Sequence, residues 1–274
     1  MAVRVRFWGV RGCVPSPAAD HLGYGGNTSC FAVTIGSRLV IFDAGTGLRP
    51  LGAAIAAHGP AEADLFLSHY HWDHIAGLPF FAPGYDPSFR LRIHGPRLDG
   101  DCGPLAALAR QMEPPNFPVT LGRMGGIAAI EEFEIGTTLT PAPGLRIVTA
   151  PLNHPGGACG YRLEAEGHVI AVVTDTEHRP GAPDPAVLAL IAGADLMLYD
   201  ATYDDDGFSD RVGWGHSTWQ EAIRLARAAG VRRLVLVHHD PDRDDRALDA
   251  AAAAAAAQWD GAAFAREGTE IILD

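Results

Sequence analysis

Apolar residues along the chain fall into short runs that are separated by glycine, proline and serine. Residues 3–8 alternate between apolar and polar side chains, which predicts a strand with one buried face. Runs rich in valine, isoleucine and phenylalanine on either side of Gly36-Ser37 predict a hairpin. Over the whole chain, this pattern predicts strands at residues 3–8, 30–35, 38–42, 64–67, 91–94, 127–134, 145–150, 159–164, 168–173, 195–199 and 233–238.

Longer segments of helical character lie between these strands, and beyond residue 184 they alternate regularly with them. We predict helices at about 47–58, 104–112, 184–192, 217–229 and 244–258. The run from Ala250 to Ala257 belongs to the last of them, because alanine has the highest helix propensity. Two sheets, each covered by helices on its outer face, would fit this order. Because no linker divides the chain, we expect residues 1–274 to form one α/β domain.

The composition is that of a globular protein with a large core, since 47% of the 274 residues are hydrophobic and 20% are charged. The 21 lysines and arginines stand against 33 aspartates and glutamates, which gives a formal net charge of −12. This charge argues against broad electrostatic binding to nucleic acid or to an anionic membrane.

The sequence also indicates where the protein works. No apolar run approaches the roughly 20 residues that span a bilayer, and the first residues lack the apolar block and cleavage site of a signal peptide. The cysteines form no Cys-x-x-Cys pair, so neither a zinc knuckle nor a disulfide framework is indicated. We therefore expect a cytoplasmic protein with reduced thiols and no membrane association.

Potential metal ligands are concentrated directly after the apolar run 64–67. His69 and His71 point the same way in an extended segment, and a turn into a helix would bring Asp73 and His74 to a neighbouring point. Three imidazoles and a carboxylate suit zinc and other first-row metals, and a carboxylate between two pairs of ligands suits a two-metal site. The alternative is a solvated polar loop, but the position behind an apolar strand favours the metal site.

Further candidate ligands follow other predicted strands. His154, Asp175 and the doublet His238-His239 each stand at the end of one. Each of them alone has an ordinary structural explanation: a histidine in a loop, an aspartate that forms a turn, and a histidine at a sheet edge whose hydrogen bonds are made within the protein. Together they form a set of polar groups at strand ends, where a rigid scaffold usually carries its site.

The order His-x-His-x-Asp-His, followed by histidine, aspartate and histidine, resembles the metallo-β-lactamase superfamily over nearly the whole chain. The resemblance implies an αββα sandwich of two mixed β-sheets flanked by helices. It also implies two divalent metal ions, with zinc as the first expectation and manganese or iron as alternatives. The implied first metal set is His69, His71, His154 and Asp175, and the second is Asp73, His74, Asp175 as a bridge, and His238, with His239 as the fallback.

Three more segments resemble the tRNase Z and cyclic phosphodiesterase branch of this superfamily. Residues 9–15 are similar to its N-terminal glycine loop, and residues 215–218 to its His-Ser-Thr motif. Residues 199–203 resemble its His-Glu-Ala-Thr segment, with Asp200 at the acidic position and tyrosine in place of histidine. Only 21 positions separate His154 from Asp175, which leaves no room for the long arm with which tRNase Z enzymes hold tRNA. That spacing fits the phosphodiesterases of small substrates.

The expected function is therefore a dinuclear metal-dependent phosphodiesterase that hydrolyses small phosphodiesters, cyclic nucleotides among them, with a metal-bridging hydroxide. Asp73 would orient the nucleophile, and His216, supported by Asp200, would contact the phosphate or protonate the leaving oxygen. A thioester or lactone hydrolase on the same site is the enzymic alternative, and a non-catalytic metal-binding helper protein is the other. We expect no stable complex with nucleic acid, and a homodimer is left open.

Substrate-binding candidates lie near these motifs. Residues 25–29 form a glycine-rich loop that could present backbone N–H groups to an anion, although an ordinary turn fits it equally well. The substrate-binding candidates are Arg11, Asn27 and Thr28 for the phosphate, His239 if His238 is the ligand, and Trp214, with Trp72, as a wall for a base.

Overall fold

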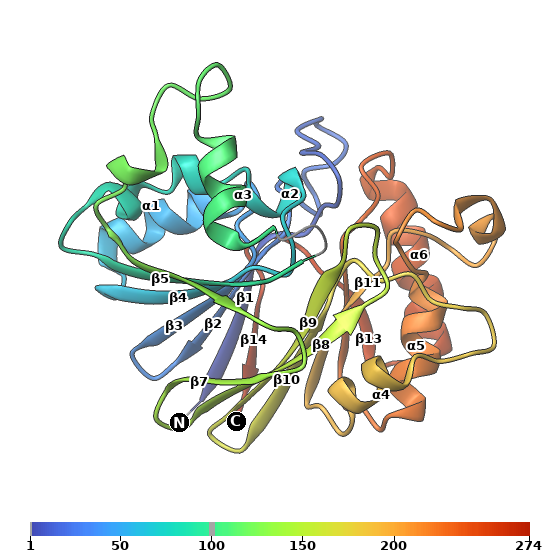
Figure 1. Ribbon diagram of the computed structural model, residues 1–274. Helices are drawn as coiled ribbons and strands as arrows, with labels where there is room; N and C mark the ends of the chain where they lie inside the picture. The colour runs from blue at the N-terminus through green and yellow to red at the C-terminus, as the bar shows by residue number, and fades with distance from the viewer. Residues whose placement is uncertain (1, 99–101) are drawn as a thin grey trace.

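The computed structural model describes residues 2–98 and 102–274, which fold into two seven-stranded β-sheets packed face to face (Figure 1). The first sheet has the order β14 (Glu270–Leu273), β1 (Val3–Gly9), β2 (Cys30–Ile35), β3 (Arg38–Phe42), β4 (Glu62–Phe66), β5 (Arg90–Pro96) and β6 (Ile127–Phe133). The second has the order β13 (Ala262–Phe264), β12 (Leu234–Val237), β11 (Leu196–Asp200), β10 (His168–Val173), β9 (Ala158–Ala165), β8 (Leu145–Leu152) and β7 (Thr138–Ala142). Both sheets mix parallel and antiparallel pairs.

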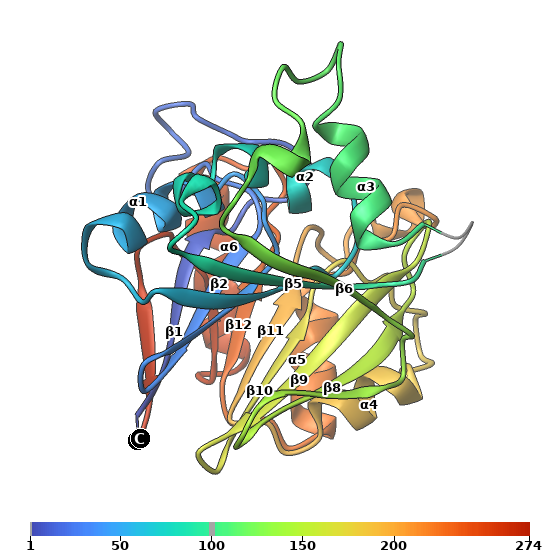
Figure 2. The ribbon, with the colours of Figure 1, turned by 60° about the vertical axis from the view of Figure 1, so that its left-hand side comes forward.

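Helices cover the outer face of each sheet, as the view in Figure 2 also shows. On the first sheet lie α1 (Leu48–His58), the short α2 (Trp72–Ile75) and α3 (Pro104–Gln111), with the 3₁₀ turns η1 (Leu78–Phe80), η2 (Ala82–Tyr85) and η3 (Leu121–Arg123). On the second lie α4 (Pro185–Ile191), α5 (Trp219–Ala228) and α6 (Asp245–Gln258), with η4 (Phe208–Arg211) in the loop before α5. The predicted αββα sandwich is confirmed.

The central core forms between the two sheets. In β1 the apolar Val3, Val5 and Phe7 are buried in this core, whereas Arg4 and Arg6 point to the other face and are exposed. Burying one such apolar side chain contributes about 1.5–3 kcal/mol, so the alternation in the sequence fixes which face of the strand turns inward. Two further apolar clusters lie under the outer helices.

Most predicted elements occur within a few residues of their expected bounds. The hairpin of β2 and β3 is antiparallel and turns at Gly36, which has a φ of 60°. Three strands were not predicted: β7 contains Pro141, β13 has three residues, and β14 pairs with β1 in the register Val3↔Leu273. Such short or distantly paired strands carry little local periodicity.

The parallel strands decide where the chemistry gathers. β3 and β4 run parallel in the first sheet, and β10, β11 and β12 run parallel in the second. Their carboxyl ends lie at one edge of the sandwich, where polar loops can meet. Within residues 2–98 and 102–274, no helix is both long enough and apolar enough to cross a bilayer.

Candidate metal centre

Polar side chains that follow strands of both sheets lie close together in one buried site. Asp43 follows β3, His69 follows β4, Asp175 follows β10 and His238 follows β12. All four side chains are almost completely buried. Asp43, Asp175 and His238 have left-handed backbone, with φ values of 63°, 55° and 60°. Such conformations are uncommon outside glycine and are concentrated at functional sites.

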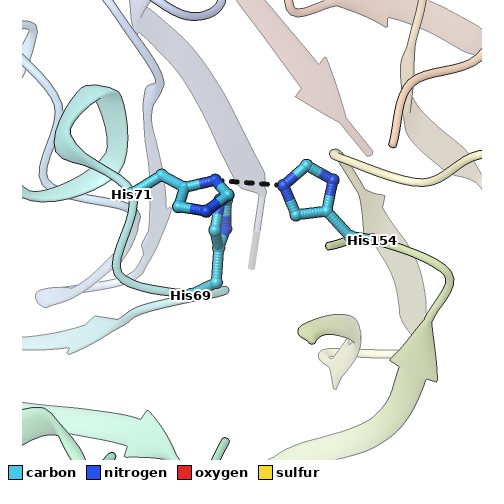
Figure 3. A group of neighbouring side chains, drawn as sticks. All are labelled: His69, His71 and His154. Carbon is cyan, nitrogen blue, oxygen red and sulfur yellow. Dashed lines mark hydrogen bonds between the residues drawn. The ribbon is translucent and has the colours of Figure 1, made fainter. Parts of the chain in front are cut away.

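A first cluster consists of three imidazoles. His69, His71 and His154 each offer a ring nitrogen, and these atoms lie within 4.8 Å of one another. Nε2 of His154 is 3.1 Å from Nδ1 of His71, and Figure 3 shows these two rings facing each other with His69 beside them. Two ring nitrogens this close suit a shared cation between them.

A second cluster combines carboxylates and imidazoles. Ligand atoms of Asp73, His74, Asp175 and His238 also lie within 4.8 Å of one another. Nε2 of His74 is 3.3 Å from Oδ2 of Asp73 and 3.2 Å from Oδ2 of Asp175. Nε2 of His238 is 3.2 Å from Oδ1 of Asp175.

Asp175 joins the two clusters. Its Oδ1 is 3.9 Å from Nε2 of His69 and 4.0 Å from Nε2 of His154, while its Oδ2 faces His74. One carboxylate is therefore within reach of ligands from both sets, as a bridging ligand of a two-cation site would be.

Buried nitrogens without partners indicate that these residues fit a cation. Among the described residues, Nε2 of His69 has no hydrogen-bond partner, and neither has Nε2 of His74, whose close contacts to Asp73 and Asp175 lack hydrogen-bond geometry. Leaving a buried polar atom unpaired costs about 1–3 kcal/mol, and a bound cation would remove that cost.

The electrostatics of the centre agree with this fit. Burial lowers the pKa of His69 and His154, which keeps both imidazoles neutral and able to bind a metal. Burial opposes ionisation of Asp175, but His238 and His74 outweigh it and lower the pKa of this carboxyl. Burial likewise opposes protonation of His74, but Asp175 and Asp73 raise its pKa well above the ordinary value. The second cluster therefore favours positive charge.

Neighbouring groups fix the rings. Nδ1 of His74 donates to Oδ2 of Asp43 at 2.9 Å, and Asp43 also accepts from the backbone N–H of Ser68 at 2.7 Å. Nδ1 of His238 lies 3.0 Å from the hydroxyl of Thr202. Such contacts set the tautomer and leave Nε2 for a metal. Asp43 was not predicted, although it stands at a strand end like the other candidates, and Thr202 was predicted only as part of the segment 199–203, without a role.

The predicted pair of His216 and Asp200 stands beside both clusters. Nδ1 of His216 donates to Oδ2 of the fully buried Asp200 at 2.9 Å. The His216 ring centre lies 4.7 Å from that of His238 and 5.4 Å from that of His154. Burial opposes protonation, but Asp200 outweighs it and raises the pKa of His216 to about 10. His216 can therefore hold a proton at the edge of the centre.

The glycine loop of residues 9–15 contacts the second cluster through its backbone. The N–H of Cys13 donates to Oδ2 of Asp73 at 2.7 Å, and Cys13 has a φ of 62°. A Cβ at Gly12 would overlap the ring of His238, so only glycine allows this close approach. The loop therefore positions ligands.

Arg11 and His239 lie elsewhere than we predicted. Arg11 is fully buried, and its guanidinium donates to four backbone carbonyls, those of Gly25, His21, Asp240 and Arg243, rather than facing the clusters. His239 is also fully buried, and its Nε2 donates to the carbonyl of Ala265 at 2.9 Å. Burial lowers the pKa of His239 to about 3. Both residues stabilise loops, so our expectation that they bind substrate is corrected.

The glycine-rich loop likewise uses its polar groups internally. The side-chain amide of Asn27 donates to Glu267 at 3.0 Å. Thr28 and Thr46 each donate a backbone N–H to the other's hydroxyl, both at 2.9 Å. Asn27 and Thr28 therefore use these polar groups within the protein, and their contact with the phosphate stays a prediction. Trp214 directly precedes Gly215 and is 56% exposed, and the guanidinium of Arg211 lies 4.9 Å from the centre of its ring.

The chain is similar to known proteins over most of its length. The family model of the β-lactamase superfamily domain matches residues 38–239, a range that contains all seven predicted metal ligands. A ribonuclease Z of Haloferax volcanii is 29% identical over 278 residues, which covers 87% of this chain and 84% of the relative. A ribonuclease BN of Escherichia coli is 27% identical over 268 residues, which covers 77% of this chain and 81% of the relative.

The fold has solved counterparts. The structure of the metallo-β-lactamase fold protein YhfI from Bacillus subtilis superposes with a TM-score of 0.75 at 22% identity, over 99% of each chain. This likeness concerns the fold, with both sheets and their covering helices.

Proposed function

Because the chain belongs to the β-lactamase superfamily, whose domain model matches residues 38–239, we propose that it hydrolyses small phosphodiesters, cyclic nucleotides among them, with two divalent cations. The predicted superfamily and its tRNase Z and phosphodiesterase branch are confirmed by the family model and by the ribonuclease Z and BN relatives. The chain is a metal-dependent hydrolase of phosphodiester bonds. The observation that carries the two-cation proposal is Asp175, which faces both clusters.

The segment between His154 and Asp175 supports a small substrate. β9 and β10 fill it as an antiparallel hairpin in the register Ala165↔His168. All residues of this segment are described, and they complete the second sheet instead of forming an arm that could hold a macromolecule. The net charge of −12 also disfavours a long polyanion.

Asp73 and His216 would have different roles in hydrolysis of the phosphodiester. When bound, two divalent cations would polarise the phosphate and lower the pKa of the attacking water. Asp73, fixed by the N–H of Cys13, would orient that water as a hydrogen-bond acceptor. His216 donates Nδ1–H to Asp200, which leaves its Nε2 to protonate the leaving oxygen.

The ligand set is compatible with several metals. We propose zinc as the first expectation, with manganese or iron as alternatives, because imidazole and carboxylate ligands accept all three. His69, His71 and His154 with Asp175 would hold one ion, and Asp73, His74, Asp175 and His238 the other. Because both sheets supply ligands, we also propose that residues 1–274 act as one domain.

A substrate panel on protein of known metal content tests this function. We expect hydrolysis of bis(p-nitrophenyl) phosphate and of a cyclic nucleotide, and no turnover after chelation. Activity only on a thioester or lactone would replace the phosphodiester proposal. RNA belongs in the panel because the similar proteins are ribonucleases. Cleavage of RNA without cleavage of small diesters would refute the proposal that the substrate is small.

A further inference from the structure

The loop of residues 207–217, here the His216 loop, lies directly against the first cluster. The carbonyl of Gly215 accepts from Nδ1 of His154 at 2.8 Å. A Cβ at Gly215 would overlap Pro155 and Nδ1 of His154, so the loop backbone packs on the imidazole itself. The same loop carries His216 and the exposed Trp214.

One side chain from another segment holds this loop. Oε2 of Glu177 accepts from the backbone N–H of Gly213 at 2.7 Å and from that of Gly215 at 2.9 Å. Both glycines have positive φ, 89° and 85°, which turns their N–H groups to the same side. A carboxylate suits this arrangement, because hydrogen bonds to an ionised acceptor are stronger than neutral ones.

The backbone of Glu177 is tied to the segment that carries His154. Its N–H donates to the carbonyl of Asn153 at 2.8 Å, and its carbonyl accepts from the side-chain amide of Asn153 at 2.8 Å. Glu177 therefore links three segments: the residues after Asp175, the residues before His154 and the His216 loop. The next residue adds a second link, since Nδ1 of His178 lies 2.8 Å from the hydroxyl of Ser217.

We propose that Glu177 is a positioning residue for the first metal cluster. Its carboxylate holds the Gly215 carbonyl against His154, and this carbonyl fixes the tautomer and direction of the His154 ring. Without the carboxylate, two backbone N–H groups lose their acceptor and the loop withdraws from His154. The inference rests on the proposed metal-dependent function but concerns cation binding, which is measured separately from hydrolysis.

Zinc titration of the metal-free protein tests the inference. In Glu177→Ala, we expect one of two Zn²⁺ binding events to weaken by roughly 10- to 100-fold, the usual effect of losing a group that orients a ligand. In Glu177→Gln, the side-chain carbonyl still accepts from both glycines, so zinc affinity should return close to the wild-type value. Turnover should follow the zinc occupancy of each variant.

A matched control separates positioning from general loss of stability. Asp245 also accepts from two backbone N–H groups, those of Gly23 at 2.8 Å and Tyr24 at 3.0 Å, but in a different loop. Asp245→Ala should lower the melting temperature and leave both zinc affinities unchanged.

Three results would overturn the inference: full zinc affinity in Glu177→Ala, an equal loss in Asp245→Ala, or no recovery in Glu177→Gln. If Glu177→Ala does not fold, Glu177→Asp replaces it, because the shorter carboxylate cannot reach both glycines, and unchanged zinc binding there would be equally decisive. Wild-type protein that binds two zinc ions yet cleaves no phosphodiester would refute the proposed function alone.

Discussion

Replacing Asp43 by asparagine should weaken cation binding at the second cluster, although Asp43 is not itself a proposed ligand. Asparagine keeps the size of the side chain and tolerates the left-handed backbone at this position, where φ is 63°. Asp43 uses both oxygens: Oδ1 accepts from the backbone N–H of Ser68 at 2.7 Å, and Oδ2 accepts from Nδ1 of His74 and from the hydroxyl of Ser68, both at 2.9 Å. The single carbonyl oxygen of asparagine cannot serve both sides, and its amide N–H groups cannot accept from His74. The substitution therefore removes the carboxylate that holds the His74 ring.

The magnitude follows from the bond to His74. The hydroxyl of Ser68 can rotate to another acceptor, whereas the ring nitrogen cannot, so the main loss is one hydrogen bond to a charged group. Such a bond contributes about 1.5–3 kcal/mol, which corresponds to roughly 10- to 150-fold in affinity. Zinc titration of metal-free Asp43→Asn should show this loss in one of the two binding events.

The matched control for this variant is Asp64→Asn. Asp64 is also a buried carboxylate with a histidine partner, Nε2 of His94 at 3.0 Å, but it lies on β4 away from the centre. The Asp64→Asn substitution should lower the free energy of unfolding without changing zinc affinity. Wild-type zinc affinity in Asp43→Asn, or an equal loss in Asp64→Asn, would refute the reasoning.

Three further outcomes are expected. Asp175→Ala should lose both cations, as measured by elemental analysis of purified protein, and a variant that retains two would refute the bridging role. His216→Ala should lower turnover by about 10²- to 10⁴-fold with metal content intact, and loss of metal would instead place His216 among the ligands. Burial raises the pKa of Asp64, but His94 and Arg92 outweigh it and lower the pKa below the ordinary value of about 3.9. The ionised Asp64 therefore stabilises the folded protein above about pH 3.9. This stabilisation is lost as the pH falls through the pKa that Asp64 has in the folded protein. Acid unfolding of Asp64→Asn should accordingly depend less on pH below 4 than that of the wild type, and identical pH profiles would contradict this.

The local sequence pattern allowed prediction of one group of site residues, whereas joining that group to His154 and Asp175 rested on the resemblance to the superfamily. His69, His71, Asp73 and His74 come from one short segment, where side-chain alternation and one turn of helix determine direction. The preference for His238 over its neighbour came from the resemblance to the superfamily. His238 faces Asp175, whereas His239 packs on Phe264.

What could not be predicted depends on segments far apart in the chain. The carbonyl partners of Arg11 come from the loops around residues 21–25 and 240–243, so its sequence position beside a glycine loop did not reveal that its donors are occupied. Glu177 gave no signal either, because its partners Gly213 and Gly215 lie more than 30 residues away. The pairing of β1 with β14 joins the two ends of the described chain in the same way.

Backbone strain links the fold to the chemistry of the centre. Asp43, Asp175 and His238 are held in left-handed conformations that cost about 1–3 kcal/mol each. Each follows a strand whose last residues are buried. The compensation comes from the partners: Asp43 accepts from Ser68 and His74, and Asp175 accepts from the hydroxyl of Thr174 at 2.6 Å and lies between two imidazoles. These same contacts fix Nε2 of His74 and the carboxylate of Asp175. The interactions that offset the backbone strain therefore also set the geometry of the cation site.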